Sequence, residues 1–260
     1  MTEAVNTRVD GAVIEITLDR PRANAIDAET SRELGRVFAG FRDDPDLRVA
    51  IFTGAGDRFF SAGWDLHAAV DGEEFEADYG EGGFGGFTEL PERDKPVICA
   101  VNGLAVGGGF EIALAAEFVV AAEHAGFFLP ETGLGLIPDA GVVRLPRILP
   151  PVVANEVLYA GRQIDAAEAL RWGLVNAVAP AGQLMTVARG LAGRIVSAAP
   201  LAVGAVMAVG RSTGHLSHRE AFDLMRSGDL HAYERMLVSE DSDEGPRAFT
   251  EKRDPVWKGR

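Results

Sequence analysis

The sequence predicts an α/β fold with a largely parallel sheet. Segments with the apolar patterns of strands are followed repeatedly by segments with helical spacing, and this order favours parallel pairing. The 260 residues, 47% of them apolar, can bury a sizeable core. Because no linker composition separates independent domains, we divide the chain only coarsely, into a core over residues 1–180 and a helical C-terminal region over residues 181–260.

The first elements follow a tight turn at Asp10-Gly11. Apolar and polar residues then alternate over 12–18, which predicts a half-buried strand. Asp27 can cap a helix that runs to about Arg42, because an aspartate oxygen accepts hydrogen bonds from the first helical N–H groups. Residues 49–54 are uniformly apolar and predict a second strand, away from the sheet edge.

The middle of the chain contains two strand-to-helix corners. One lies at residues 61–66, and the other joins an apolar strand at 96–101 to a helix that begins at the glycines 107–109. The acidic, glycine-rich segment 71–92 between them predicts a mobile flap. Further strands are expected at 118–122 and, on a weaker pattern, at 174–178.

The last third is predicted to be helical. Capping patterns, proline and glycine punctuate it. The expected helices begin at Asp165, span 183–199 and 201–211, run from Ser217 to about Val238, and end with 247–252 after an acidic junction at 240–246.

Composition limits the classes of function. A formal net charge of −14 disfavours nucleic acid and anionic membranes as partners. The single cysteine, Cys99, lies in an apolar run and is expected to be inert, and the five histidines lack metal-ligand spacing. Polar residues interrupt every apolar run before 18 residues, and the start of the chain lacks the pattern of a secretory signal. We therefore expect a cytoplasmic protein without a membrane span or a bound metal.

Chemistry is concentrated between residues 96 and 131. The N–H groups at the start of a helix have no intrahelical partner, and glycines let a ligand approach them closely. Gly108 can therefore supply one N–H donor to a carbonyl oxygen, and Ala62, at the other corner, a second. Glu111 and Glu131 could then move protons beside that carbonyl. The alternative is that both glutamates are solvated or pair with helix dipoles.

Several motifs, taken in order, resemble the enoyl-CoA hydratase/isomerase (crotonase) family. These are Arg20-Pro21 with Asn24-Ala25-Ile26, Phe60-Ser61-Ala62-Gly63-Trp64-Asp65, Asn102-Gly103 with Gly107-Gly108-Gly109-Phe110-Glu111, Leu129-Pro130-Glu131-Thr132-Gly133, and Phe249-Thr250-Glu251-Lys252-Arg253. The resemblance implies a superhelical spiral of ββα units as the core, a helical C-terminal region, and homotrimers that commonly pair into homohexamers.

The same resemblance implies roles for four residues. Ala62 and Gly108 match the oxyanion-hole positions, and Glu111 and Glu131 match the two catalytic glutamates. Hydratases of the family keep both glutamates, whereas isomerases generally keep only the second, so water addition is favoured. Glu111 would then hold and activate water while Glu131 exchanges the proton at C2, although coupled carboxyls leave this division open. No metal or redox cofactor is implied.

The implied ligand is a coenzyme A thioester. Arg22 is the first candidate for a phosphate contact and Arg58 the second; the alternative for each is an exposed surface arginine. Matched positions assign the CoA contacts to Arg22, Ala25, Ala62, Gly63, Trp64 and Asp65, and assign a contact with a neighbouring subunit's CoA to Phe249 and Lys252.

Some stretches, such as residues 23–28, 41–51 and 251–260, resemble the members of this family that act on carnitinyl-CoA. A trimethylammonium group favours aromatic faces and acidic surroundings, and Trp64, Tyr79, Phe84 and Phe87, with Asp78 and Glu81, lie in or next to the expected flap. The expected acyl pocket contains Trp64, Phe84, Phe87 and Pro138. The aromatic residues could instead cover an uncharged acyl tail. A generic short-chain enoyl-CoA hydratase, an isomerase and a non-catalytic paralogue therefore remain alternatives. The loop Pro138-Asp139-Ala140-Gly141-Val142 departs from the family's usual Pro-x-x-Gly-Gly.

Overall fold

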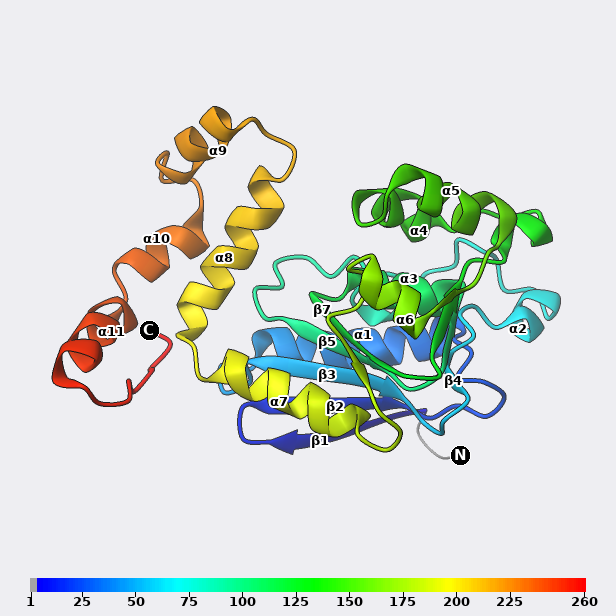
Figure 1. The fold of residues 1–260 in the computed structure, drawn as a ribbon, viewed down its shortest axis with the longest axis horizontal. Coiled ribbons are helices and arrows are strands. Elements are labelled where there is room, and N and C mark those ends of the chain that lie inside the picture. Colours follow the sequence, from blue (N-terminus) through cyan, green and yellow to red (C-terminus); the bar gives the residue numbers. More distant parts are fainter. Residues whose placement is uncertain (1–3) are drawn as a thin grey trace. The chain divides into compact units, whose positions relative to one another are not determined.

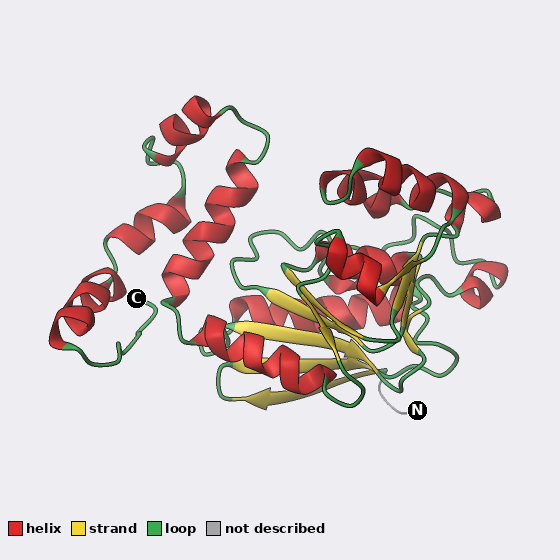
Figure 2. Cartoon of the chain, viewed as in Figure 1, coloured by secondary structure: helices red, strands yellow, loops and turns green. Residues whose placement is uncertain are grey.

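The chain alternates between two β-sheets in the computed structural model, which describes residues 4–260 (Figures 1 and 2). Residues 1–3, at the start of the expected core, lie outside the described part. One unit comprises the described residues up to 92 together with 96–192, and the other comprises 93–95 and 193–260.

Both sheets belong to the first unit. The larger sheet has the order β1-β2-β3-β5-β7-β10 and the smaller one the order β4-β6-β8-β9. The strands of the larger sheet are β1 (Val5–Asp10), β2 (Val13–Leu18), β3 (Val49–Gly54), β5 (Val97–Val101), β7 (Phe118–Ala122) and β10 (Ala177–Ala179). Those of the smaller sheet are β4 (Phe59–Ser61), β6 (Leu104–Val106), β8 (Gly126–Phe128) and β9 (Ile164–Asp165). Pairing is parallel except for β1 with β2 and β8 with β9.

Each turn of the core contributes one strand to each sheet. β3 is followed by β4 and then a helix, β5 by β6 and a helix, and β7 by β8 and further helical segments. This is the spiral of ββα units that was predicted, and it is confirmed.

Helices fill the connections and make up the second unit. In the first unit they are α1 (Ala28–Asp43), α2 (Leu66–Val70), η1 (Phe84–Gly86), α3 (Gly108–Ala115), η2 (Glu131–Leu134), α4 (Asp139–Arg144), η3 (Leu145–Arg147), α5 (Pro151–Ala160) and α6 (Ala166–Arg171). α7 (Leu184–Val196) leads into the second unit, which contains α8 (Pro200–Thr213), α9 (His218–Met225), α10 (His231–Leu237) and α11 (Glu240–Glu251).

The predicted first helix is confirmed as α1. The Asp27 carboxylate accepts a hydrogen bond from the Thr30 N–H at 2.8 Å, as expected of an N-cap. Leu34 and Phe38 are fully buried, and the Phe38 ring packs edge-on against Phe52 of β3, 5.8 Å between centroids. Helix α1 is thereby fixed to the larger sheet.

One strand of the larger sheet was not predicted, and another lies later in the chain than expected. Residues 5–10 form β1, which pairs with β2 across the predicted Asp10-Gly11 turn. Most side chains of β1 are exposed, and its residues therefore lack the alternating or continuous apolar pattern by which the other strands were predicted. The weak strand expected at 174–178 is displaced to β10, because the preceding residues close the end of α6.

The prediction of a mobile flap at 71–92 is wrong for its second half. Gly85 and Gly86 are buried. The Ser31 hydroxyl of α1 accepts from the Gly85 N–H at 2.9 Å and donates to the Gly83 carbonyl at 3.2 Å. Several glycines of this segment adopt positive φ, a conformation that glycine reaches without strain. The glycines therefore let the backbone pack closely on α1 and do not mark a flexible segment.

The C-terminal helices also differ from expectation. The helix capped by Ser217 ends at Met225, and α10 is a separate helix. The acidic junction at 240–246 is the first part of α11, where carboxylates favour the positive end of the helix dipole. Within residues 4–260 no single helix is long and apolar enough to span a membrane; α7 and α8 reach that length only together.

Candidate active site

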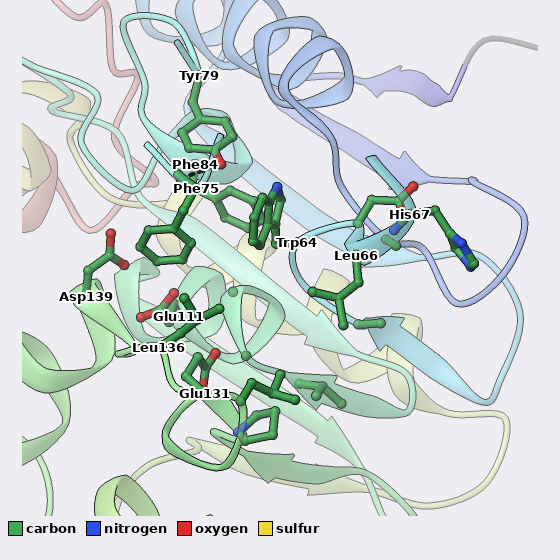
Figure 3. Close-up of a pocket in the computed structure, with 18 of the residues that line it drawn as sticks. Trp64, Leu66, His67, Phe75, Tyr79, Phe84, Glu111, Glu131, Leu136 and Asp139 are labelled. Carbon is green, nitrogen blue, oxygen red and sulfur yellow. Dashed lines mark hydrogen bonds between the residues drawn. The ribbon is translucent and has the colours of Figure 1, made fainter. Parts of the chain in front are cut away.

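A cavity of about 490 Å³ opens in the first unit. Four segments that the sequence singled out line it: the loop after β2, the corner between β4 and α2, the start of α3, and the η2 region (Figure 3). The predicted site residues among its lining are Arg22, Ala25, Ala62, Trp64, Asp65, Phe84, Gly108, Glu111 and Glu131. Segments far apart in the chain therefore meet at one site.

The glycine loop gives one N–H donor. Gly107 has φ +54° and ψ −127°, a conformation suited to glycine, and a Cβ there would lie 2.5 Å from Oε1 of Glu131. The Gly107 carbonyl accepts from the N–H groups of Phe110 and Glu111, which starts α3. Among the described residues, the Gly108 N–H that follows has no acceptor. Gly108 lines the cavity, as predicted for an oxyanion donor.

The second donor is not the predicted one. The Ala62 N–H is already bonded to the Ala23 carbonyl at 2.9 Å, so Ala62 cannot offer it to a ligand. Trp64 forms a parallel bridge with Ile26, in which the Gly63 carbonyl and the Asp65 N–H make the bonds. The N–H of Trp64 itself has no acceptor within residues 4–260.

This free N–H lies near that of Gly108. A Cβ on Gly63, which has φ +76°, would come within 2.6 Å of the Gly108 nitrogen. The backbone that carries the Trp64 amide is thus packed against the start of α3. The geometry replaces Ala62 by Trp64 as the partner of Gly108, and leaves Ala62 as a lining residue.

Glu111 is a buried carboxyl in the first turn of α3, with 6% of its surface exposed. Its Oε1 accepts a hydrogen bond from the Gly141 N–H at 2.7 Å. Burial raises the pKa of Glu111 to about 8; the Gly141 bond opposes this rise, and the negative charges of Asp139 and Glu131 add to it. A carboxyl of this kind can hold a proton at neutral pH.

Glu131 begins η2 directly after Pro130 and is 9% exposed. Burial, reinforced by the charge of Asp139, also raises the pKa of Glu131. Its Oε1 faces Gly107, and its Oε2 has no hydrogen-bond partner among the described residues. Glu131 therefore lies beside the loop that carries the Gly108 donor, whereas Glu111 is tied to Gly141, at the start of α4.

The loop after β2 is shaped by a buried asparagine. Arg22, Ala23 and Asn24 all have positive φ, an uncommon run for non-glycine residues. The Asn24 side chain secures it, because its amide donates to Ala55 and Phe59 carbonyls at 3.1 and 3.0 Å. The result is that Arg22 and Ala25 line the cavity, as predicted for CoA contacts.

Arg20, which the sequence analysis named only as part of a motif, also lines the cavity. Its guanidinium donates to Asp65 at 2.8 Å, to the Ala25 carbonyl at 2.7 Å, and to Asp27. Asp65, a predicted CoA contact, is therefore committed to an ion pair that fastens α2 to the loop after β2. The predicted Arg58 lines a neighbouring hollow together with Arg22.

Aromatic side chains form one wall of the cavity. Trp64 packs edge-on against Phe75 at 5.4 Å, and Tyr79 against Phe84 at 5.3 Å (Figure 3). The Trp64 indole N–H donates to Glu73 at 2.8 Å, which fixes the ring. Tyr79 was expected among the aromatic residues near the acyl end, whereas Phe75, in the same flap segment, was not predicted.

Two predicted acyl-pocket residues lie elsewhere. Phe87 is 2% exposed and packs on Phe38, 4.5 Å between ring centroids, so it belongs to the core. Pro138 is buried as the residue that precedes α4, and its neighbours Ile137 and Asp139 line the cavity instead. Gly63 does not line the cavity; it lies behind the two free N–H groups.

Phe249 and Lys252 lie in the second unit, on α11 and at its C-cap. The Phe249 side chain is 86% exposed, which suits a residue that contacts another molecule. Their predicted contact with the CoA of a neighbouring subunit stays a prediction.

Comparisons with known proteins identify the family. Residues 8–260 match the family model described as enoyl-CoA hydratase/isomerase. The chain is 58% identical to a carnitinyl-CoA dehydratase of Escherichia coli, over all of both chains. It resembles a crystal structure of enoyl-CoA hydratase from Mycobacterium tuberculosis (TM-score 0.90, 36% identity, 99% of this chain and 100% of the other). It also resembles one of carnitinyl-CoA hydratase from Mycobacterium avium (TM-score 0.77, 40% identity, all of both chains). The chain belongs to the enoyl-CoA hydratase/isomerase family.

Proposed function

We propose that the chain is a hydro-lyase that adds water to, or removes it from, the C2=C3 bond of a CoA thioester, with crotonobetainyl-CoA and carnitinyl-CoA as the substrate pair. The observation that carries the proposal is that two buried glutamates line the same cavity as two residues with free N–H groups, Trp64 and Gly108. The carnitine part is supported by the full-length relative from E. coli named carnitinyl-CoA dehydratase.

The N–H groups of Trp64 and Gly108 bind the thioester oxygen. As negative charge develops there, each donor stabilises the enolate-like transition state by ~3–4 kcal/mol. Both amides are held by surrounding backbone, Gly108 at the start of α3 and Trp64 in the bridge to Ile26, so little reorganisation is needed.

The position of each glutamate suggests its role. Glu131 lies beside Gly107 and hence beside the carbonyl, so it exchanges the proton at C2. Glu111 lies towards α4, further along the acyl group, so it holds and deprotonates the water that attacks C3. The raised pKa of Glu111 suits the elimination direction, in which protonated Glu111 gives its proton to the leaving hydroxyl group while Glu131 takes the proton from C2. Hydration is the reverse of these two transfers.

The thioester's CoA part would extend past Arg22 and Ala25, where the cavity is lined by basic and polar groups. Arg22 is exposed and can contact a phosphate. We further propose that the protein acts in the cytoplasm as a homotrimer or a homohexamer, for which the family resemblance and the exposed Phe249 are the support. No metal or redox cofactor enters the proposed reaction.

The loss of enoyl-thioester absorbance tests the proposal. Crotonobetainyl-CoA and crotonyl-CoA are offered side by side to the wild-type protein. We expect turnover of both with a clear preference for crotonobetainyl-CoA. Equal rates on the two would make the protein a generic short-chain enoyl-CoA hydratase, and absence of turnover on both would leave the non-catalytic paralogue.

A further inference from the structure

One carboxylate in the cavity has no part in the proposed water chemistry. Asp139 is the first residue of α4 and lines the cavity next to Glu111 (Figure 3). Its Oδ1 accepts from the Ala140 N–H at 2.7 Å, which orients the carboxylate. Among residues 4–260 Asp139 has no ion-pair partner, although it is close enough to raise the pKa values of both glutamates.

The basic and the acidic residues that line the cavity lie in different parts of it. Its basic lining residues, Arg20, Arg22 and His67, come from the loop after β2 and from α2. In Figure 3, His67 and Asp139 lie on opposite sides of Trp64. The groups that face Asp139 are acidic or aromatic, namely Glu111, Glu131 and Tyr79, and its charge also raises the pKa of Tyr79. No cation of the described chain offsets the carboxylate at this end.

Aromatic rings complete the surroundings of Asp139. Phe75 and Tyr79 line the same cavity as Asp139. Each ring is locked by an edge-to-face contact, Phe75 with Trp64 and Tyr79 with Phe84. A quaternary ammonium group has no hydrogen-bond donor, so aromatic faces and an uncompensated negative charge are what can recognise it.

We propose that Asp139, with the ring faces of Phe75 and Tyr79, forms a subsite for the quaternary ammonium group of the substrate and sets the preference for a cationic over an uncharged acyl group. This inference rests on the proposed function and extends it by naming the residue that binds the end of the acyl group farthest from the thioester. Asp139 is exposed in the free protein, and a cation bound there offsets a charge that an uncharged acyl chain would leave unpaired.

Binding of saturated thioesters tests the subsite without interference from catalysis. γ-Butyrobetainyl-CoA carries the trimethylammonium group and butyryl-CoA lacks it, and neither has the double bond. Isothermal titration measures both Kd values for the wild type, Asp139→Asn and Asp139→Ser. The matched control is Glu76→Gln, which removes one exposed carboxylate from the same segment as Phe75 but outside the cavity lining.

We expect both Asp139 variants to weaken γ-butyrobetainyl-CoA by about 10- to 100-fold and to change butyryl-CoA by less than about threefold. Glu76→Gln should change neither. Equal weakening of both ligands, an unchanged ratio of the two Kd values, or a control that loses as much would overturn the subsite. The wild-type activity assay is separate: if wild type binds γ-butyrobetainyl-CoA through Asp139 but hydrates neither enoyl thioester, the proposed function fails and the subsite stands.

Discussion

Replacing Glu111 by glutamine should stabilise the fold at alkaline pH. Glu111 is 6% exposed, and burial raises the pKa of this carboxyl from 4.5 to about 8. Between these values the unfolded chain has lost the proton and the folded chain has kept it, so the free energy of unfolding falls as pH rises. Glutamine is close in shape and its carbonyl oxygen can still accept from the Gly141 N–H.

The size of the effect follows from the two pKa values. Each pH unit between 4.5 and about 8 is worth about 1.4 kcal/mol, which sets an upper limit of ~5 kcal/mol. Because the carboxyl borders an open cavity where water can approach, we expect less than half of this limit, ~2 kcal/mol, once pH exceeds 8. At pH 5 the difference between variant and wild type should be close to zero.

Urea unfolding at pH 2 to 9 measures this difference, with protein concentration fixed because any self-association would add to the measured stability. Glu168→Gln is a control of opposite sign. The Arg162 ion pair lowers the pKa of Glu168 to about 2, so that variant should be less stable at neutral pH by up to ~1 kcal/mol. Its deficit should disappear as pH falls from 4.5 towards 2. A Glu111→Gln variant that is equally stable or less stable than wild type at pH 9 would refute the reasoning.

Three further variants address catalysis and CoA binding. Glu131→Gln should lower kcat by ~10²-fold or more in the absorbance assay with little change in KM; a near-normal kcat would remove Glu131 from the chemistry. Gly108→Ala places a methyl group against the Phe84 ring and beside the N–H donor, so kcat should fall ~10²–10³-fold while circular dichroism stays native. Arg22→Ala should raise KM for CoA thioesters ~3- to 10-fold, whereas the exposed Arg36→Ala on α1 should not; equal effects of the two would assign Arg22 to the general surface.

Much of the site could be predicted because its reactive residues belong to short sequence motifs. The change from an apolar run to glycines and then to helix formers identified Gly108 and Glu111, and both line the cavity. Asp27 was identified as a helix cap for a similarly local reason. Such features depend on neighbours within a few residues, which the sequence displays directly.

The misassigned oxyanion donor shows where local reasoning ends. Whether Ala62 or Trp64 keeps a free N–H depends on the Ala23 carbonyl, almost forty residues earlier. That carbonyl reaches Ala62 only because the loop after β2 turns through three residues with positive φ, held by Asn24. Sequence patterns contain no record of which backbone groups pair between distant segments.

Two other differences have the same origin. Phe87 and Phe84 are three residues apart, yet the Phe87 ring packs in the core against Phe38 and the Phe84 ring lines the cavity, because η1, which begins at Phe84, packs on α1. Asp139 stood out only as a departure from the usual loop pattern. Its position facing Glu111 becomes visible once α4 is placed beside α3.

The fate of hydrogen from solvent tests the central claim most directly. Crotonobetainyl-CoA is incubated with the wild-type protein in D₂O, and the product is examined by mass spectrometry and proton NMR after exchange of its hydroxyl group. The account predicts a hydrated product that carries one non-exchangeable deuterium, at C2. Glu111→Gln and Glu131→Gln should each suppress the formation of this product. Deuterium incorporation without gain of water, or a product formed at the same rate by both variants, would contradict it.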